Sequence, residues 1–117
     1  GDHCVLSKGL DNCIAIYTAE SWEQLSNTLQ SLPSNKSSAR AIKRFYFGSA
    51  AELEFDKQGR ILVPSALREH AKLQKDAVII GTGDKVEIWS RERFDAYDAE
   101  VADSVESLAE GLEGIVL

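Results

Sequence analysis

The sequence has few of the residues that build disulfide scaffolds or metal sites. It contains only two cysteines and two histidines in 117 residues. Cys4 and Cys13 are too few for a disulfide scaffold and lack the spacing of a zinc site. His3 and His70 lie far apart, with no cluster of carboxylates and cysteines beside them. We therefore expect no metal and no cofactor, and we interpret both cysteines as small buried hydrophobic residues.

Long hydrophobic runs are also missing. No stretch approaches the roughly 18 to 20 apolar residues that cross a bilayer, and the first residues, Gly1-Asp2-His3, lack the basic and hydrophobic regions of a signal peptide. We expect a cytoplasmic protein that does not bind membranes. The absence of an initiator methionine is consistent with a cut or processed end at Gly1.

Catalytic motifs are absent too. The chain has no nucleophile elbow, P-loop, metal triad or acid and base pair with a recognisable spacing. We therefore expect a protein that is not an enzyme and has no small-molecule substrate. With 44% hydrophobic and 27% charged residues, the chain is nevertheless long enough for one compact domain with a hydrophobic core.

Positive charge is in deficit overall, but its distribution is uneven. The formal net charge is -6, which at first argues against nucleic-acid binding. Residues 36–75, however, hold nine Lys and Arg against four acids, whereas residues 76–117 hold three against eleven. The negative charge of residues 76–117, taken alone, is explained equally well by solvated helices whose charge serves solubility. The basic centre is harder to explain in this way, because it contains the most informative motif.

That motif is a charged turn over residues 54–64, between two β-prone runs. Gly59 can adopt a positive φ at little steric cost, and the Asp56 carboxylate can accept hydrogen bonds from N–H groups just downstream. Such a turn would hold the Arg60 guanidinium outward, and this planar cation suits phosphate oxygens and guanine edges. A plain hairpin with a surface salt bridge between Asp56 and Arg60 is the alternative.

A weak internal repeat relates residues 2–22 to residues 76–94. Each passage predicts a strand, a glycine-containing turn and a second strand that ends in an aromatic residue, Tyr17 or Trp89. Five residues later a second aromatic follows, Trp22 or Phe94, in the first turn of a helix that a hydroxyl side chain can cap. These aromatics could line a ligand site, but their recurrence favours core packing.

Between and after these passages the periodicity predicts further elements. Helices are expected over residues 21–32, 36–47 (ended by Gly48), 64–70 and 90–110. Residues 51–55 and 60–63 are expected to pair as a hairpin. On the second helix, Arg40, Lys43 and Arg44 face outward, either as a phosphate track or as an ordinary solvated face.

In combination these features resemble the MraZ family, whose two tandem halves are related to the AbrB and SpoVT swapped-hairpin transcription factors. The resemblance covers essentially the whole chain and rests on residues 7–13 with Tyr17 and Trp22, 39–41, 44–47, 56–60 with Pro64, 67–71 and 87–90. It implies a mixed α/β fold with a small double-split, swapped-hairpin β-barrel of two pseudo-equivalent halves and peripheral helices. We expect these halves at residues 1–48 and 49–117, together forming one compact domain.

The resemblance also implies a function: a cytoplasmic, nucleoid-associated bacterial regulator, usually a repressor, of the division and cell wall gene cluster. Such a regulator binds repeated sites in promoter DNA as a homo-oligomeric ring, commonly octameric or larger. The family's D-x-x-x-R motif occurs once per half, and its arginine contacts DNA. Here only Asp56 and Arg60 match, so we expect the first half to lack its hairpin.

The chemistry of the motif suggests a role for each residue. Arg60 would contact phosphate or guanine, Lys57 would add nearby positive charge, and Gln58 could hydrogen-bond a base edge. Asp56 and Gly59 would shape the loop rather than touch DNA. A protein-interaction or antitoxin-like module is the alternative, because the swapped-hairpin scaffold also serves partners other than promoters.

Overall fold

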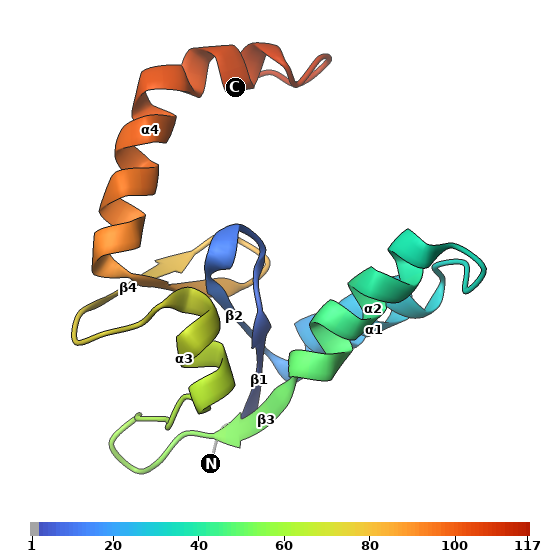
Figure 1. The fold of residues 1–117 in the computed structure, drawn as a ribbon, viewed down its shortest axis with the longest axis vertical. Coiled ribbons are helices and arrows are strands. Elements are labelled where there is room, and N and C mark those ends of the chain that lie inside the picture. The colour runs from blue at the N-terminus through green and yellow to red at the C-terminus, as the bar shows by residue number, and fades with distance from the viewer. Residues whose placement is uncertain (1–2) are drawn as a thin grey trace.

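In the described residues, five antiparallel strands form a central sheet, α3 packs on it, and α1, α2 and α4 extend away from it (Figure 1). The computed structural model describes residues 3–117; the expected strand start at Asp2 lies outside this range. The elements are β1 (His3–Lys8), the 3-10 helix η1 (Leu10–Asn12), β2 (Ile14–Tyr17), α1 (Ala19–Gln30), α2 (Ser37–Ser49), β3 (Ala51–Glu54), α3 (Ser65–Ala71), β4 (Ala77–Gly81), β5 (Val86–Ser90) and α4 (Arg91–Glu110).

The sheet joins segments from both ends of the chain in the order β3-β1-β2-β5-β4. The two strand pairs predicted from the repeat are confirmed as β1 with β2 and β4 with β5. Their second strands also pair with each other, with Ile14 opposite Ile88. The repeated passages therefore lie side by side in one sheet and meet where β2 pairs with β5.

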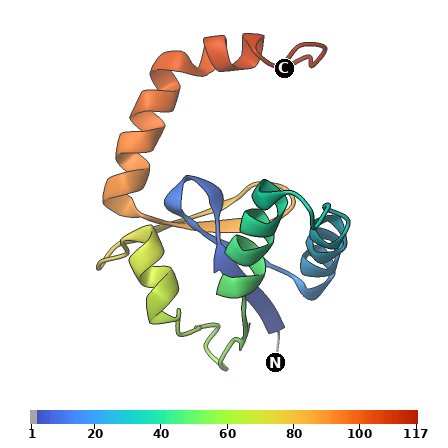
Figure 2. The same ribbon diagram turned by 45° about the vertical axis from the view of Figure 1, so that its right-hand side comes forward.

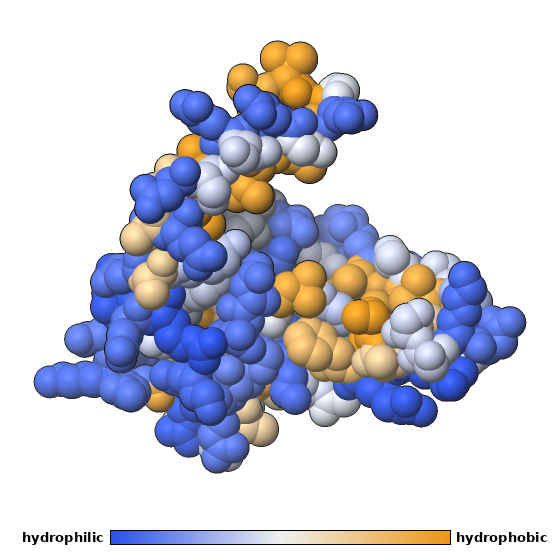
Figure 3. All heavy atoms as spheres, turned by 45° about the horizontal axis from the view of Figure 1, so that its top comes forward, coloured by the Kyte–Doolittle hydropathy of each residue, from blue (hydrophilic) through white to orange (hydrophobic). Residues whose placement is uncertain are grey.

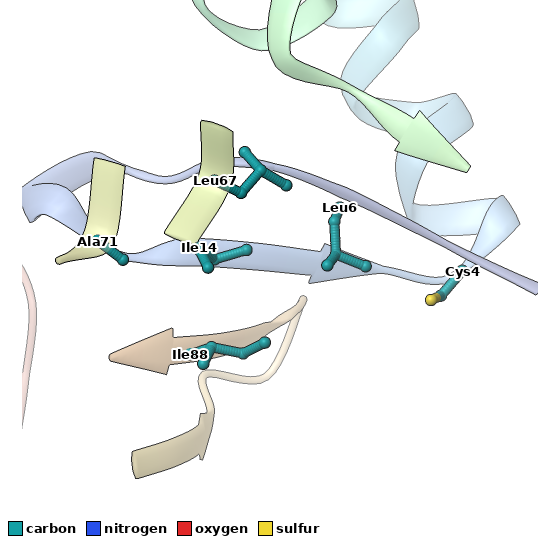
Figure 4. Packing of buried hydrophobic residues seen from close by; sticks show 6 residues of the cluster. All are labelled: Cys4, Leu6, Ile14, Leu67, Ala71 and Ile88. Atoms are coloured by element: carbon teal, nitrogen blue, oxygen red, sulfur yellow. The ribbon is translucent and has the colours of Figure 1, made fainter. Parts of the chain in front are cut away.

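One face of the sheet is covered by α3, and the core lies between them. Figure 4 shows Leu67 and Ala71 of α3 facing Leu6, Ile14 and Ile88 of the strands. Pro64 and Ser65 begin this helix as expected, because a helix start tolerates proline and loses no hydrogen bond there.

Both cysteines are free and buried, which confirms their interpretation as small hydrophobic residues. Burial is the main reason that the pKa of the Cys13 thiol is raised to about 12. Since the thiolate is the reactive form, this cysteine is chemically quiet at neutral pH.

Helices α1 and α2 form an antiparallel pair, here called the helical hairpin, that extends to one side of the sheet (Figures 1 and 2). The Thr18 hydroxyl caps α1 by accepting a hydrogen bond from Ser21 N–H at 3.0 Å. The expected stop of the second helix at Gly48 was wrong, because α2 continues to Ser49. The Ser49 hydroxyl fixes this end by accepting a hydrogen bond from Lys8 N–H of β1.

Helix α4 leaves the opposite end of the sheet and rises away from the rest of the protein (Figure 2). The predicted cap is confirmed, because the Ser90 side chain accepts a hydrogen bond from Arg93 N–H at 3.3 Å. The predicted aromatic pairs also form: ring centroids are 5.4 Å apart for Tyr17 and Trp22, and 5.5 Å apart for Trp89 and Phe94. Tyr17 and Trp89 are buried, so both pairs act in packing.

The second strand of the expected hairpin, residues 60–63, does not form. After β3 the chain runs through a turn and an extended segment that has no strand partner within the described residues. Consequently the sheet is open, with β3 and β4 at its edges, and a closed barrel is not formed by this single chain. Among the described residues, no helix is both long and apolar enough to span a membrane.

Candidate nucleic-acid interface

The predicted turn, here called the arginine loop (residues 56–60), protrudes between β3 and α3. It is anchored on both sides, because Phe55, Ile61 and Val63 are partly buried against the core. All five residues of the loop itself are exposed. The structure therefore combines buried ends with an exposed tip, an arrangement that presents polar side chains at a fixed place.

Backbone hydrogen bonds close the loop. Asp56 N–H donates to the Arg60 carbonyl oxygen at 2.8 Å, and Gly59 N–H donates to the Asp56 carbonyl oxygen at 3.0 Å. Gly59 has a φ of 77°, in the left-handed region where a Cβ is unfavourable. This confirms the backbone conformation that the sequence predicted for Gly59.

The Asp56 carboxylate is the second organiser of the loop. Its Oδ1 accepts hydrogen bonds from Gln58 N–H at 2.8 Å and Arg60 N–H at 2.9 Å. These bonds favour the ionised form, that from Arg60 N–H most of all, and so lower the pKa of the Asp56 carboxyl. An aspartate so engaged holds the backbone of the loop.

The Arg60 side chain is 72% exposed, so its guanidinium is accessible to a macromolecular ligand. Its Nε lies 3.3 Å from Asp56 Oδ2, and its Nη2 donates to Gln58 Oε1. These two bonds use only part of the guanidinium, which has five N–H groups. The remaining donors can bind an anion or a base edge without breaking the arrangement.

The Gln58 side chain makes a contact with Arg60 that the sequence did not reveal. Its carbonyl oxygen accepts from Arg60 Nη2, and the NH2 group of the same amide can donate to a ligand. That geometry suits a phosphate oxygen or a base acceptor. The three predicted DNA-contacting side chains, Lys57, Gln58 and Arg60, are thus together on one exposed loop.

The basic residues of α2 divide into two groups. Arg40 Nη1 donates to the Ser34 carbonyl oxygen at 2.9 Å, and Lys43 Nζ lies 3.5 Å from Ser34 Oγ. The Arg40 bond fastens the turn between α1 and α2, which helical periodicity could not show, and Lys43 lies beside it. Arg44 is exposed on the same helix.

Within the part of the chain that the structure describes, no candidate metal centre accompanies the loop. Among residues 3–117, no group of three or more His, Cys, Asp or Glu is arranged to hold a metal ion. A cavity of about 510 Å³ lies elsewhere, between η1 and the helical hairpin, and includes Tyr17 and Tyr46 in its lining. The arginine loop lies apart from this cavity and remains the candidate site, because its cationic side chains are exposed.

Comparison with known proteins gives a family. The model of the family described as "MraZ protein, putative antitoxin-like" matches twice, over residues 1–45 and 46–113. A protein from Heliobacterium modesticaldum named Transcriptional regulator MraZ is 54% identical over 112 residues, which cover 96% of this chain and 78% of the relative. Proteins of the same name from Desulforamulus reducens and Thermoanaerobacter pseudethanolicus are 48% and 49% identical, covering 96% and 97% of this chain and 79% of each relative. The chain therefore belongs to the MraZ family.

Proposed function

We propose that this protein is a DNA-binding transcriptional regulator whose arginine loop contacts promoter DNA. The observation that carries the proposal is the loop geometry: an exposed guanidinium held by a carboxylate and a glycine turn on buried anchors. The relatives named as transcriptional regulators support it. Following the family resemblance, the target is a set of repeated boxes upstream of division and cell wall genes, the usual effect is repression, and the protein is cytoplasmic and nucleoid-associated.

Each side chain of the loop has a distinct part in binding. The free N–H groups of Arg60 donate to phosphate or to guanine O6 and N7. The Gln58 amide donates beside it, and Lys57 adds a nearby positive charge. Asp56 does not touch the anionic ligand, because repulsion would oppose it; it keeps the loop preorganised so that little entropy is lost on binding.

The segment after the loop supports assembly between chains. Ile61 and Val63 are partly buried whereas Leu62 is 84% exposed, an alternation typical of a strand. We propose that residues 60–63 pair with a strand of a second copy, which would complete the swapped-hairpin barrel. The two halves, residues 1–48 and 49–117, would then act as pseudo-equivalent units of a ring-shaped homo-oligomer.

Ring assembly would overcome the unfavourable net charge of -6. One loop offers only two cations to the DNA, but linked loops that engage several boxes at once gain affinity by about 10² to 10⁴ when the spacing fits. Repeated boxes are thus a geometric requirement of the proposal.

The decisive test is Arg60→Ala with Arg91→Ala as its matched control. Both arginines are exposed, and each has an ion-paired aspartate four residues away, at 3.3 Å and 3.6 Å. Both substitutions change the net charge equally, so general electrostatics affects them alike. In fluorescence anisotropy with promoter boxes, we expect Arg60→Ala to weaken binding at least about 10-fold, as lost base or phosphate contacts do. Equal effects of the two substitutions would refute the assignment.

A protein-interaction or antitoxin-like module is the second candidate, and the family description itself favours keeping it. The two differ in chemistry. A module that binds a protein partner through another surface would retain its function after Arg60→Ala, and its binding would not fall steeply with salt.

A further inference from the structure

The second half of α4 and the segment that follows it, together called the outer half of α4 (residues 98–117), have an uncovered apolar face. Helix α4 packs on β4 and β5 only at its base, where Phe94 and Tyr97 contact Trp89. Beyond this point Val101, Val105 and Leu108 continue the apolar row at intervals of three and four residues. Val105 and Leu108 are 51% and 55% exposed. A row of this kind, extended by Leu112, indicates a binding surface rather than scattered exposed residues.

The charge of this half limits what can cover it. Residues 98–117 contain six carboxylates and no lysine or arginine. Two copies of α4 packed against each other would bring together two strongly anionic segments, which is unfavourable. A surface that is both apolar and basic is the better partner.

The helical hairpin is such a surface. Its two carboxylates, Glu20 and Glu23, lie at the start of α1, whereas residues 24–51 contain no carboxylate and four cations: Lys36, Arg40, Lys43 and Arg44. On the same helix, Ile42 and Phe47 are 40% and 38% exposed. Ile42 with Tyr46, and Lys43 with Phe47, form two neighbouring rows on the surface of α2, so apolar and basic side chains alternate there.

These two surfaces do not meet within one chain. Figures 1 and 2 show α4 and the helical hairpin at opposite ends of the sheet, and Figure 3 shows separate hydrophobic areas on each. Because each is exposed and their charges are opposite, each copy offers both halves of a contact. A contact between two different surfaces of identical chains propagates from copy to copy, and it gives a closed ring when the rotation between neighbours closes.

We propose that the outer half of α4 of one copy docks on the helical hairpin of a second copy. Val101, Val105 and Leu108 pack against Ile42 and Phe47, while carboxylates beside the apolar row face Arg40, Lys43 and Arg44. The inference rests on the ring assembly in the proposed function and specifies the contact that builds it, separately from the arginine loop.

Complementation of two variants tests this inference. The tail variant, Val105→Asp/Leu108→Asp, disables α4 and leaves the hairpin intact; the hairpin variant, Lys43→Glu/Arg44→Glu, does the reverse. Light scattering coupled to size exclusion should give each variant alone a smaller mass than the unchanged protein. An equimolar mixture should form a larger species than either, because one complete contact remains. The control, Ala96→Asp/Ala99→Asp, adds the same charge to the exposed opposite face of α4 and should keep the full mass.

The outcomes separate this inference from the proposed function. A tail variant with the full mass would overturn the docking while leaving a ring built by other surfaces. Two small variants that fail to complement would mean that α4 contacts something other than the hairpin, and would also overturn it. An unchanged protein that is monomeric at all concentrations would instead refute the ring. Circular dichroism confirms folding, and Lys43→Ala/Arg44→Ala replaces the hairpin variant if charge reversal unfolds it.

Discussion

At the scale of single residues, the arginine loop depends on one carboxylate. Asp56 accepts two backbone N–H groups through Oδ1 and contacts Arg60 through Oδ2. The charged form makes all three interactions stronger, so ionisation and loop order are coupled. Since Asp56 is exposed, this coupling concerns the local order of the loop rather than the global stability of the protein.

The coupling predicts a pH-dependent loop. The pKa of Asp56 is below its ordinary value of 3.8 in the folded protein, so the bonds persist at neutral pH and are lost as the pH falls through the lowered pKa. In NMR titrations, the amide protons of Gln58 and Arg60 should move upfield together with a midpoint below 3.8. In Asp56→Asn the same amides should show no such step. A midpoint at or above the ordinary value would contradict the geometry.

The sequence was sufficient to predict which residues shape the loop but not how the side chains meet. Gly59 and Asp56 act on the backbone within the same short segment, and turn chemistry is local. The bond from Arg60 to Gln58 depends on side-chain rotamers at the tip, which no spacing specifies. For the same reason the sequence could not show that Arg40 donates to the Ser34 carbonyl oxygen or that Lys43 lies beside Ser34 Oγ.

At the scale of elements, the tight connection between β1 and β2 is a packing constraint. Gly9 N–H donates to the Cys13 carbonyl oxygen at 2.8 Å, and the Gly9 carbonyl oxygen lies 3.1 Å from His70 Nε2 of α3. A Cβ at Gly9 would lie 2.7 Å from the buried Cys13 sulfur. Glycine is needed here for space, because its φ of -107° suits any residue.

Gly9→Ala should therefore destabilise the fold by about 1–3 kcal/mol, as overpacking of a core does. Urea denaturation at fixed protein concentration measures this loss. Cys13→Ala removes the clashing sulfur. The double variant Gly9→Ala/Cys13→Ala should therefore lose less stability than the sum of the two single losses, by about 0.5 kcal/mol or more. Strictly additive losses would show that the sulfur is not the obstacle.

The elements themselves differ in how far local sequence determines them. The hydroxyl caps expected after each aromatic are formed by Thr18 and Ser90, and the Thr18 cap makes α1 begin at Ala19, two residues before the expected start at residue 21. Residues 60–63 have the composition and alternation of a strand, but a strand needs a neighbour, and the chain provides none within its described residues. Gly48 did not stop α2, because its position inside the last turn is tolerated when Ser49 ties the helix end to β1.

At the scale of the whole molecule, both the distribution of charge and the shape favour assembly of several copies. The protein is anionic overall, while its loop and helical hairpin are basic and its α4 is acidic. Its Cα atoms extend over 43 × 40 × 25 Å, with α4 and the helical hairpin projecting from a small sheet. Such a shape leaves the surfaces of α4 and the helical hairpin uncovered in one chain. Assembly of several copies would cover them.

Assembly makes a quantitative prediction about salt. On duplex DNA each neutralised phosphate contributes about -0.9 to the slope of log K against log salt. One loop with Lys57 and Arg60 would therefore give a slope of about -1 to -2, whereas linked loops add their slopes. With DNA of constant length, anisotropy titrations between about 50 and 200 mM salt should give a slope about twice as steep for two correctly spaced boxes as for one. Arg60→Ala should flatten both slopes. Equal slopes for one and two boxes would show that the copies bind singly. Linked loops would then not explain how a protein with a net charge of -6 binds DNA.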